Sequence, residues 1–359
     1  MTLNLGSSAE LHVVHDPTEP APPDGQSVIP VHPAVLQPGT SSPVDIYARA
    51  PEAEEFRLRA EAGTVLGDGF RRRLREQGVN TLFVRRSDRQ AYWHYVEDHI
   101  ETILHADLMP RREAGELVYG VSRRAMDEVF RAPRARGNVE RAYGLVDAVV
   151  TSVLRDSDAI WHMVGVAPVR FRTYSHCVNV ALFLIAGCNG IFGINDPKVL
   201  KRIGMGAIFH DIGKSELPEY LLAVPQERMD RDETQACREH PMLGLDILRG
   251  QGRVTPTSEA IIRWHHERAD GTGYPDGLPA VQLPTVVRLA CIVNAYDFLI
   301  TERPFGEAMM PFDALRAMLG EMPGRFDPDL VMKFAQFMGP TRSTLNARSR
   351  PGGTPSEFH

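Results

Sequence analysis

Cysteine is scarce and scattered in this chain. Its four cysteines, Cys177, Cys188, Cys237 and Cys291, form no Cys-x-x-Cys pair. This spacing suggests neither a disulfide framework nor a cysteine-ligated zinc site, and it favours a reducing compartment. An excess of positive charge is also missing, because the formal net charge is -6. A nucleic-acid polymer is therefore not expected as a partner.

Long uninterrupted apolar runs are lacking as well. The most apolar stretch, residues 178–194, contains Asn179, Asn189 and several small residues. We predict a buried core helix and its turn there rather than a membrane span. The first residues, MTLNLGSSAELHVVHD, have no basic start followed by an apolar core, so no secretion signal is predicted. We expect a cytoplasmic protein.

The first third of the chain changes character once. Residues 1–42 are rich in Pro, Ser, Thr and Gly without a sustained apolar period, which predicts a flexible N-terminal segment. Apolar and polar residues then alternate around residues 44–48, 56–60 and 81–84, and helical spacing follows at residues 92–104. We therefore predict a small α+β module over residues 43–108, with a regulatory role assigned by elimination.

The rest of the chain has helical periods. Apolar stripes at residues 117–129 and 139–153 predict connecting helices over residues 109–160. A larger helical domain is expected over residues 161–340, and the polar residues 341–359 predict a disordered tail. The expected fold class is mainly α, with a small α+β module in front.

A His-Asp pair stands at the end of an apolar run, in the sequence His210-Asp211-Ile212-Gly213-Lys214. An adjacent imidazole and carboxylate at a helix end can hold metal from one piece of backbone, and the carboxylate can bridge two ions. Lys214, three residues on, can meet a bound phosphate. Taken alone, such a dipeptide is a weak signal, because an adjacent pair is more often a surface turn.

Further histidines along the chain support a metal site at the His-Asp pair. His176, His210, His240 and the pair His265-His266 are separated by roughly 25 to 35 residues, about one helical hairpin each. They can therefore converge on one cavity. A core histidine satisfied by its surroundings is the alternative for any one of them, but five beside His-Asp favour a metal site.

A glycine-rich loop follows the last two histidines directly. It reads Glu267-Arg268-Ala269-Asp270-Gly271-Thr272-Gly273-Tyr274-Pro275-Asp276-Gly277. Its glycines allow backbone conformations that other residues avoid, and its proline stiffens the exit. A plain surface loop would explain these residues, but not their place beside the histidine pair.

HDIGK followed by HHERADGTGYPDGL resembles the HD-GYP family, a bacterial branch of the HD superfamily whose members hydrolyse cyclic di-GMP. The resemblance covers about residues 170–340 and implies that residues 161–340 are an HD-GYP metal-dependent phosphohydrolase domain. It implies an all-helical HD-superfamily bundle that holds two divalent ions, usually iron or manganese. We call residues 267–277 the GYP loop.

The resemblance also implies roles for individual residues. His176, His210 and Asp211 would hold one ion, and Asp211, His240, His265 and His266 the other, with Asp211 bridging. Lys214 would contact phosphate, Arg303 would reach the ligand's phosphate or base, and Tyr274 with Gly273 and Pro275 would line the nucleotide site. Asp211 and Lys214 are thus the expected catalytic residues. Water held between two cations ionises near neutral pH and can attack phosphorus.

The chain departs from the family pattern at two ligand positions. A glutamate of three-metal members is Arg172 here, so we expect at most two ions. An aspartate ligand of the family is Asn294, whose amide oxygen can coordinate but brings no charge. Asp297, three residues on, is expected to turn away from Asn294 and to make an ordinary helix or loop contact.

Two functions remain open at this point. One is a phosphodiesterase that converts cyclic di-GMP to pGpG, and on to GMP in a second step. The other is a catalytically weakened receptor or scaffold, suggested by Asn294, that binds cyclic di-GMP or a GGDEF-type diguanylate cyclase through the GYP loop. Hydrolysis of another nucleotide is disfavoured by the GYP loop. The apolar stripes at residues 117–154 would permit a homodimer.

Overall fold

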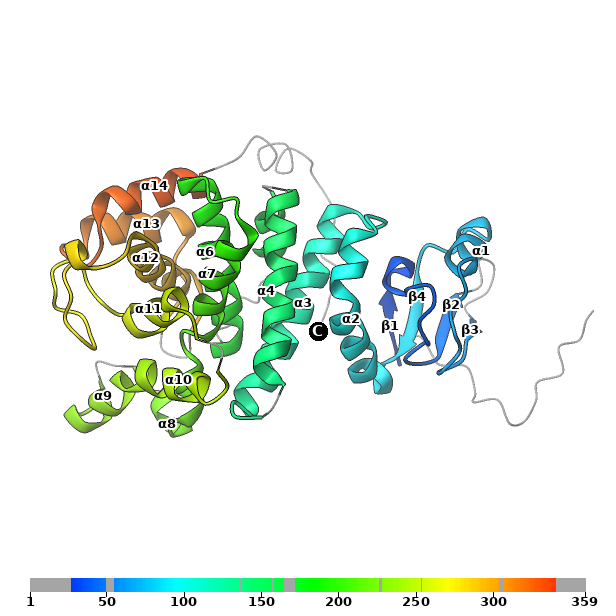
Figure 1. Ribbon diagram of the computed structural model, residues 1–359, viewed down its shortest axis with the longest axis horizontal. Helices are drawn as coiled ribbons and strands as arrows, with labels where there is room; N and C mark the ends of the chain where they lie inside the picture. Colours follow the sequence, from blue (N-terminus) through cyan, green and yellow to red (C-terminus); the bar gives the residue numbers. More distant parts are fainter. Residues whose placement is uncertain are drawn as a thin grey trace, which may run out of the picture. The chain divides into compact units, whose positions relative to one another are not determined.

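The computed structural model describes residues 27–49, 55–135, 137–156, 158–164, 172–225, 228–252, 254–303 and 306–339 (Figure 1). The chain divides into two compact units, residues 1–95 and 96–359. Residues 1–26 of the expected flexible segment and the expected tail at 341–359 lie outside the described residues.

The first unit contains an antiparallel four-stranded sheet in the order β1-β4-β2-β3. Its strands are β1 (Val28–Val31), β2 (Ile46–Arg49), β3 (Phe56–Ala60) and β4 (Leu82–Arg85), with η1 (Pro33–Val35), α1 (Phe70–Glu76) and η2 (Arg86–Asp88) between or after them. Val28, Tyr47 and Phe56 form a buried cluster on the sheet. The α+β character expected for this region is thus present, and α2 (Arg89–His105) begins in it and continues into the second unit.

The expected flexible segment 1–42 extends too far along the chain. Residues 28–31 pair with residues 82–85 as β1 and β4, and Val35 and Leu36 are each only 1% exposed. The strand is four residues long, VIPV, and contains a proline, so its sequence carries no alternation by which it could be recognised. Its partner strand lies some fifty residues away in sequence, and this tertiary pairing outweighs the local composition.

The second unit is helical. Its elements in chain order are α3 (Arg111–Arg131), α4 (Asn138–Arg155), α5 (Ala159–Val164), α6 (Thr173–Phe192), α7 (Pro197–Phe209), η3 (Ile212–Glu216), α8 (Glu219–Leu222), α9 (Arg231–Arg238), α10 (His240–Arg249), α11 (Pro256–Trp264), η5 (Ala280–Gln282), α12 (Thr285–Ile300), α13 (Pro311–Gly320) and α14 (Pro328–Met338). Side chains cap several starts, such as Asp196 for α7 and Thr255 for α11. The mainly α fold is therefore confirmed.

Helix α6 forms the centre of this unit. It packs against α3, α4, α7, α12 and α14. By length and composition it could cross a membrane, but 78% of its apolar window is buried among its neighbours. It is thus the buried core helix that the sequence predicts, because a helix that is apolar all round needs other helices on every side.

Helices α3 and α4 belong to the same unit as α6 and α7 rather than forming a separate connector. They pack on α6, and α4 also packs on α7 (Figure 1). Their apolar stripes, with Val121 and Val129 on α3 and Val146 and Val149 on α4, are buried within the unit. These stripes therefore have a partner inside the chain, and a homodimer is not needed to cover them.

Candidate metal centre

Three of the predicted histidine ligands are held in the same way near the end of a helix: His210 and His265 directly follow α7 and α11, and His240 comes two residues after α9 and begins α10. The last carbonyls of a helix have no partner within it. Each of these rings donates its Nδ1 hydrogen to the carbonyl three residues earlier: His210 to Ala207 at 2.7 Å, His240 to Cys237 at 2.6 Å and His265 to Ile262 at 2.8 Å. Since a carbonyl can only accept, the hydrogen is on Nδ1, and the Nε2 lone pair of each ring is directed away from its helix end.

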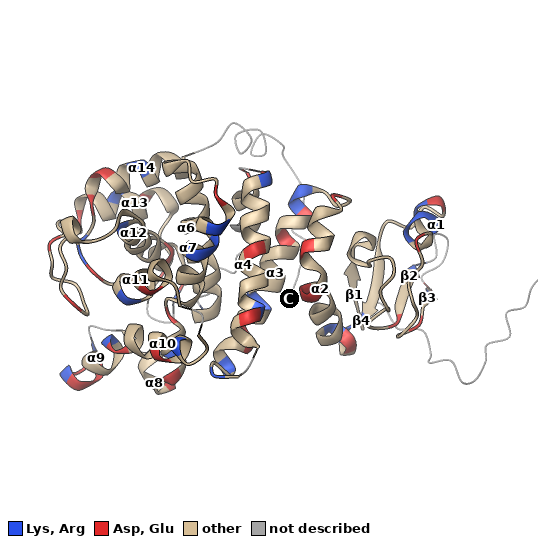
Figure 2. Ribbon diagram, in the orientation of Figure 1, with Lys and Arg blue, Asp and Glu red and all other residues tan. Residues whose placement is uncertain are grey.

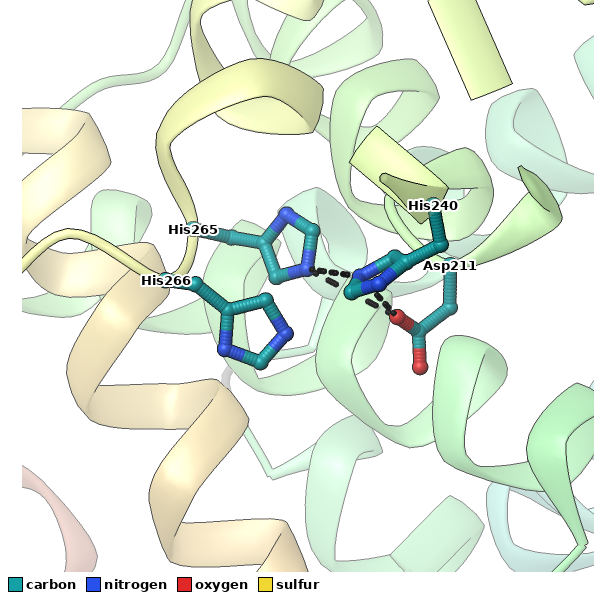
Figure 3. Close-up of side chains that lie close together, drawn as sticks. All are labelled: Asp211, His240, His265 and His266. Atoms are coloured by element: carbon teal, nitrogen blue, oxygen red, sulfur yellow. Dashed lines mark hydrogen bonds and ion pairs between the residues drawn. The ribbon is translucent and has the colours of Figure 1, made fainter. Parts of the chain in front are cut away.

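The carboxylate of Asp211 lies between two pairs of imidazole Nε2 atoms. Its Oδ1 is 3.2 Å from His240 Nε2 and 3.6 Å from His265 Nε2 (Figure 3). Its Oδ2 is 3.5 Å from His210 Nε2 and 3.8 Å from His176 Nε2. The two oxygens of one carboxylate thus face two different pairs of imidazoles, which is the arrangement that a bridging ligand requires.

The donor set fits divalent cations. Two groups of side chains each bring their ligand atoms within 4.8 Å of one another: Asp211, His240, His265 and His266, and His176, His210 and Asp211. The closest pairs, His176 with His210 at 3.3 Å and His240 with His265 at 3.2 Å, match the edge of a coordination shell whose bonds are roughly 2.0–2.2 Å. Lone pairs that face a carboxylate repel it unless a cation lies between them. Among the described residues, the buried His266 Nε2 has no hydrogen-bond partner, as expected for a metal ligand.

Burial keeps the ligands in the form that metal binding needs. It lowers the pKa of His240 to about 4 and holds the pKa values of His210 and His266 well below their ordinary value, so these rings are neutral. Burial would raise the pKa of Asp211, but Lys214, whose Nζ is 2.6 Å from Oδ2, and the surrounding imidazoles hold that pKa well below its ordinary value. The centre therefore offers an anionic carboxylate between neutral imidazoles.

His176 is fixed differently, and the prediction for Asp297 is wrong. Asn294 Oδ1 lies 2.9 Å from His176 Nε2, and Asp297 Oδ2 lies 2.6 Å from His176 Nδ1. Three residues along a helix correspond to a rotation of about 60° from the starting direction, so both side chains leave α12 on one face and reach opposite nitrogens of the same ring. Asp297 is a buried partner of His176, a predicted metal ligand, rather than an ordinary helix contact.

The GYP loop is held by Glu267, a residue to which the sequence assigns no role. Its buried carboxylate accepts hydrogen bonds from the backbone N–H groups of Asp276, Gly277 and Leu278 at 2.8–3.0 Å. Gly273 lies so close to the start of the loop that a Cβ there would be 2.4 Å from Arg268 N. The loop therefore closes on itself directly beside His265 and His266.

The predicted substrate residues lie around this centre to different extents. Tyr274 stacks on His266 with ring centroids 4.6 Å apart, and burial raises its pKa, so it keeps its hydroxyl hydrogen. Pro275 follows it in the loop. Arg303 stacks over Phe298 at 3.3 Å; burial lowers its pKa to about 10, while Asp297 and Asp211 act on it in the opposite direction. It is therefore within electrostatic reach of the centre.

Asp297 and Glu267 are the two residues of the site that sequence reasoning missed. Their signals were present in part: Asp297 shares a helix face with Asn294, and Glu267 stands directly after the histidine pair. The hydrogen-bond donors to these two carboxylates could not be predicted from the sequence. His176 is 121 residues from Asp297, and the amides that Glu267 binds depend on the path of the loop.

Comparisons with known proteins agree with this geometry. Residues 193–330 match the model of the HD domain family. A cyclic di-GMP phosphodiesterase of Pseudomonas aeruginosa is 31% identical over 67% of this chain and 55% of its own length. The cyclic di-GMP phosphodiesterase response regulator RpfG of Xanthomonas campestris is 37% identical over 39% of this chain and 36% of its own length. The chain thus spans about half of the first relative and a smaller share of the second.

Two further comparisons bear on substrate and fold. A 3'3'-cGAMP-specific phosphodiesterase of Vibrio cholerae is 24% identical over 54% of this chain and 37% of its own length. The solved structure of an HDG"Y"P protein from Bdellovibrio bacteriovorus is 19% identical, with a TM-score of 0.59 over 87% of this chain and 100% of that one, and shows that the fold is shared. Together with the histidine-aspartate cluster and the GYP loop, these matches show that the chain belongs to the HD-GYP branch of the HD domain family.

Proposed function

We propose that this chain is a metal-dependent phosphodiesterase that opens cyclic di-GMP to pGpG, with GMP as the product of a further step. The observation that carries the proposal is the two-sided contact of Asp211 with four imidazoles. Relatives named as cyclic di-GMP phosphodiesterases support the substrate. A buried carboxylate between two sets of imidazoles suits two divalent ions, for which iron and manganese are the candidates.

In this proposal the ligands are His176, His210, Asp211 and Asn294 on one side, and Asp211, His240, His265 and His266 on the other. Two bound cations would supply a hydroxide nucleophile near neutral pH and neutralise charge on the phosphoryl group. The protein's own part is to place and hold the substrate.

Lys214 and Arg303 are the cations proposed to hold substrate phosphate. The Lys214 side chain is 24% exposed, whereas the Asp211 carboxylate beside it is 1% exposed. The ammonium group therefore lies at the border between the buried centre and solvent, where an arriving phosphate would meet it and its charge would stabilise the transition state. Gly273, Tyr274 and Pro275 are proposed to line the nucleotide side of the pocket.

The test is hydrolysis by protein that is purified without oxygen and loaded with Fe(II) or, separately, with Mn(II). Cyclic di-GMP and 3'3'-cGAMP are assayed side by side, because relatives are named for each. We expect turnover of cyclic di-GMP, its loss in His240→Ala, and its retention in His105→Ala. His105 is a matched control, since its Nδ1 also contacts a carbonyl, of Glu101 at 2.7 Å, but at an exposed position. No turnover of cyclic di-GMP with either metal refutes the proposal.

The alternative is a weakened receptor or scaffold, and Asn294 is the observation that favours it. An amide in place of a carboxylate removes one negative charge from the ligand set and lowers metal affinity. Under this alternative, Asn294→Asp increases both metal content and rate, and the GYP loop serves to bind cyclic di-GMP or a GGDEF-type diguanylate cyclase. Binding of cyclic di-GMP without hydrolysis, measured by calorimetry, would favour the receptor.

Location and assembly are proposed on simpler grounds. The cysteines Cys177, Cys188, Cys237 and Cys291 are all unpaired, in keeping with a reducing compartment such as the cytoplasm. Basic and acidic side chains are interspersed over the described helices (Figure 2), in keeping with a small-molecule substrate rather than a nucleic-acid polymer. We propose no homodimer through α3 and α4, because their apolar stripes are buried within the chain.

A further inference from the structure

A buried chain of hydrogen bonds leads from His176 to helix α3. Asp297 on α12 binds His176 Nδ1 through Oδ2 at 2.6 Å and accepts a hydrogen bond from Asn179 Nδ2 at its other oxygen at 2.8 Å. Asn179 Oδ1 in turn accepts a hydrogen bond from the Tyr119 hydroxyl at 2.9 Å. All four residues are at most 5% exposed. The chain therefore joins α3, α6 and α12 away from solvent.

The carboxylate of Asp297 determines which group donates and which accepts in each of these hydrogen bonds. A carboxylate can only accept, so Asn179 must donate to Asp297 through its amide hydrogens and must present its oxygen to Tyr119. For the same reason, His176 must carry a hydrogen on Nδ1. Its Nε2 lone pair then points to Asn294 and to Asp211, as ligation requires.

His176 needs this arrangement because it differs from the other ligands in its place on a helix. The rings of His210, His240 and His265 donate to carbonyls in the last turn of a helix, each three residues earlier in the chain. His176 lies in the first turn of α6, where carbonyls are engaged by the helix itself, and Arg172 O already accepts from His176 N. The ring of His176 is held instead by a side chain, that of Asp297.

The charges around His176 also support a role for Asp297 in holding this ligand. Asn294, the proposed ligand on the His176 side, is neutral, whereas the buried carboxylate of Asp297 is stabilised by nearby positive charge, of which Arg303 supplies a part. Asp297 contacts the ring of His176 directly, and a carboxylate in this position makes an imidazole a stronger ligand. A cation at Nε2 would in turn compensate Asp297 through the ring.

We propose that Asp297, Asn179 and Tyr119 are positioning residues that fix His176 as a ligand, and that Asp297 supplies the negative charge that Asn294 lacks. The proposal rests on the metal centre proposed above. It predicts that the ion on the His176 side depends on these residues, while the ion on the His240 side does not.

The experiment measures Mn(II) affinity and stoichiometry by titration of metal-free protein, with no assay of activity. Asp297→Asn keeps the shape and removes the charge, and we expect the weaker of the two Mn(II) sites to lose affinity about 10- to 100-fold. Tyr119→Phe removes one neutral hydrogen bond and should cost about 2- to 10-fold. Tyr92→Phe is the control. Tyr92 and Tyr119 are both 2% exposed, but Tyr92 does not belong to the hydrogen-bonded series that ends at His176.

Two readouts separate positioning from mere stability. The thermal midpoint of metal-free Asp297→Asn should match that of the metal-free wild type. The gain in Mn(II) affinity from Asn294→Asp should be larger in the Asp297→Asn background than in the wild type, because a second carboxylate then replaces the missing charge.

The outcomes distinguish this inference from the proposed function. If the wild type binds two Mn(II) ions and Asp297→Asn binds both as tightly, the inference fails while the metal centre stands. The inference is also refuted if metal-free Asp297→Asn has a lower thermal midpoint than the wild type and Asn294→Asp raises Mn(II) affinity equally in both backgrounds. The hydrogen bonds from Tyr119 to His176 then have only a structural role. A wild type that takes up no Mn(II) overturns the metal centre and this inference together.

Discussion

Replacing Gly213 by alanine tests how closely the two halves of the centre are packed. A Cβ at this position would lie 2.0 Å from His240 O and 2.6 Å from Gly244 N. Both neighbours are backbone atoms and cannot rotate away. Reaching even 3.0 Å, the shortest separation that a Cβ tolerates, requires that η3 and α10 separate by about 1 Å. Because Asp211 precedes η3 and His240 begins α10, the separation falls directly on the 3.2 Å contact between Asp211 and His240.

The magnitude follows from this movement. Overpacking of this kind costs roughly 1–3 kcal/mol of unfolding free energy, and a ligand displaced by 1 Å can cost about 100-fold in rate. We expect Gly213→Ala to lower the urea midpoint and to lose Mn(II) and most of its turnover of cyclic di-GMP. The matched control is Gly144→Ala on α4, where a Cβ meets nothing within 4 Å and the helix should gain about 0.5–1 kcal/mol. A Gly213→Ala protein with the wild-type urea midpoint and Mn(II) content would refute the close approach.

Two further predictions concern the loop and the metal. Glu267→Ala removes the acceptor of three backbone N–H groups, so hydrogen exchange at Asp276, Gly277 and Leu278 should accelerate and unfolding free energy should fall by at least about 2 kcal/mol; unchanged exchange at these amides would contradict the role of Glu267. Saturation with Mn(II) should raise the thermal midpoint, because an ion at 100 times its dissociation constant adds about 2.7 kcal/mol per site, and EDTA should reverse the rise. His240→Ala should abolish about half of this shift, because His240 is a proposed ligand of one of the two ions, whereas an undiminished shift in His240→Ala would place the ions elsewhere.

The sequence predicted those parts of the fold that depend on local pattern. Helical periods identified α3 and α4, and the apolar run at residues 178–194 identified α6 as a core helix. Strand β1 was missed because its four residues form a strand only through their pairing with β4. The spacing of His176, His210, His240 and His265 indicated a metal site, and the structure brings their Nε2 atoms to one carboxylate.

What could not be predicted is how each ligand is held. The sequence shows which histidines exist, but the acceptor of each Nδ1 depends on where its helix ends. A helix boundary is uncertain by a residue or two from sequence, and one residue decides whether a carbonyl is engaged or available. Glu267 is a second example, since the amides that it accepts from meet only after the loop has closed.

The different supports of the histidines divide the centre into two unlike halves. His240 and His265 are fixed by backbone carbonyls, which no substitution of the accepting residue removes. In the other half His210 is also fixed by a backbone carbonyl, but His176 depends on side chains, Asp297 and Asn294, which single substitutions can change. Both departures from the family's ligand pattern, Arg172 and Asn294, fall on this half: Arg172 precedes His176 on α6, and Asn294 contacts its ring. In the proposed centre, we therefore expect substitutions on this side to change the affinity for one ion while the ligands of the other ion stay in place.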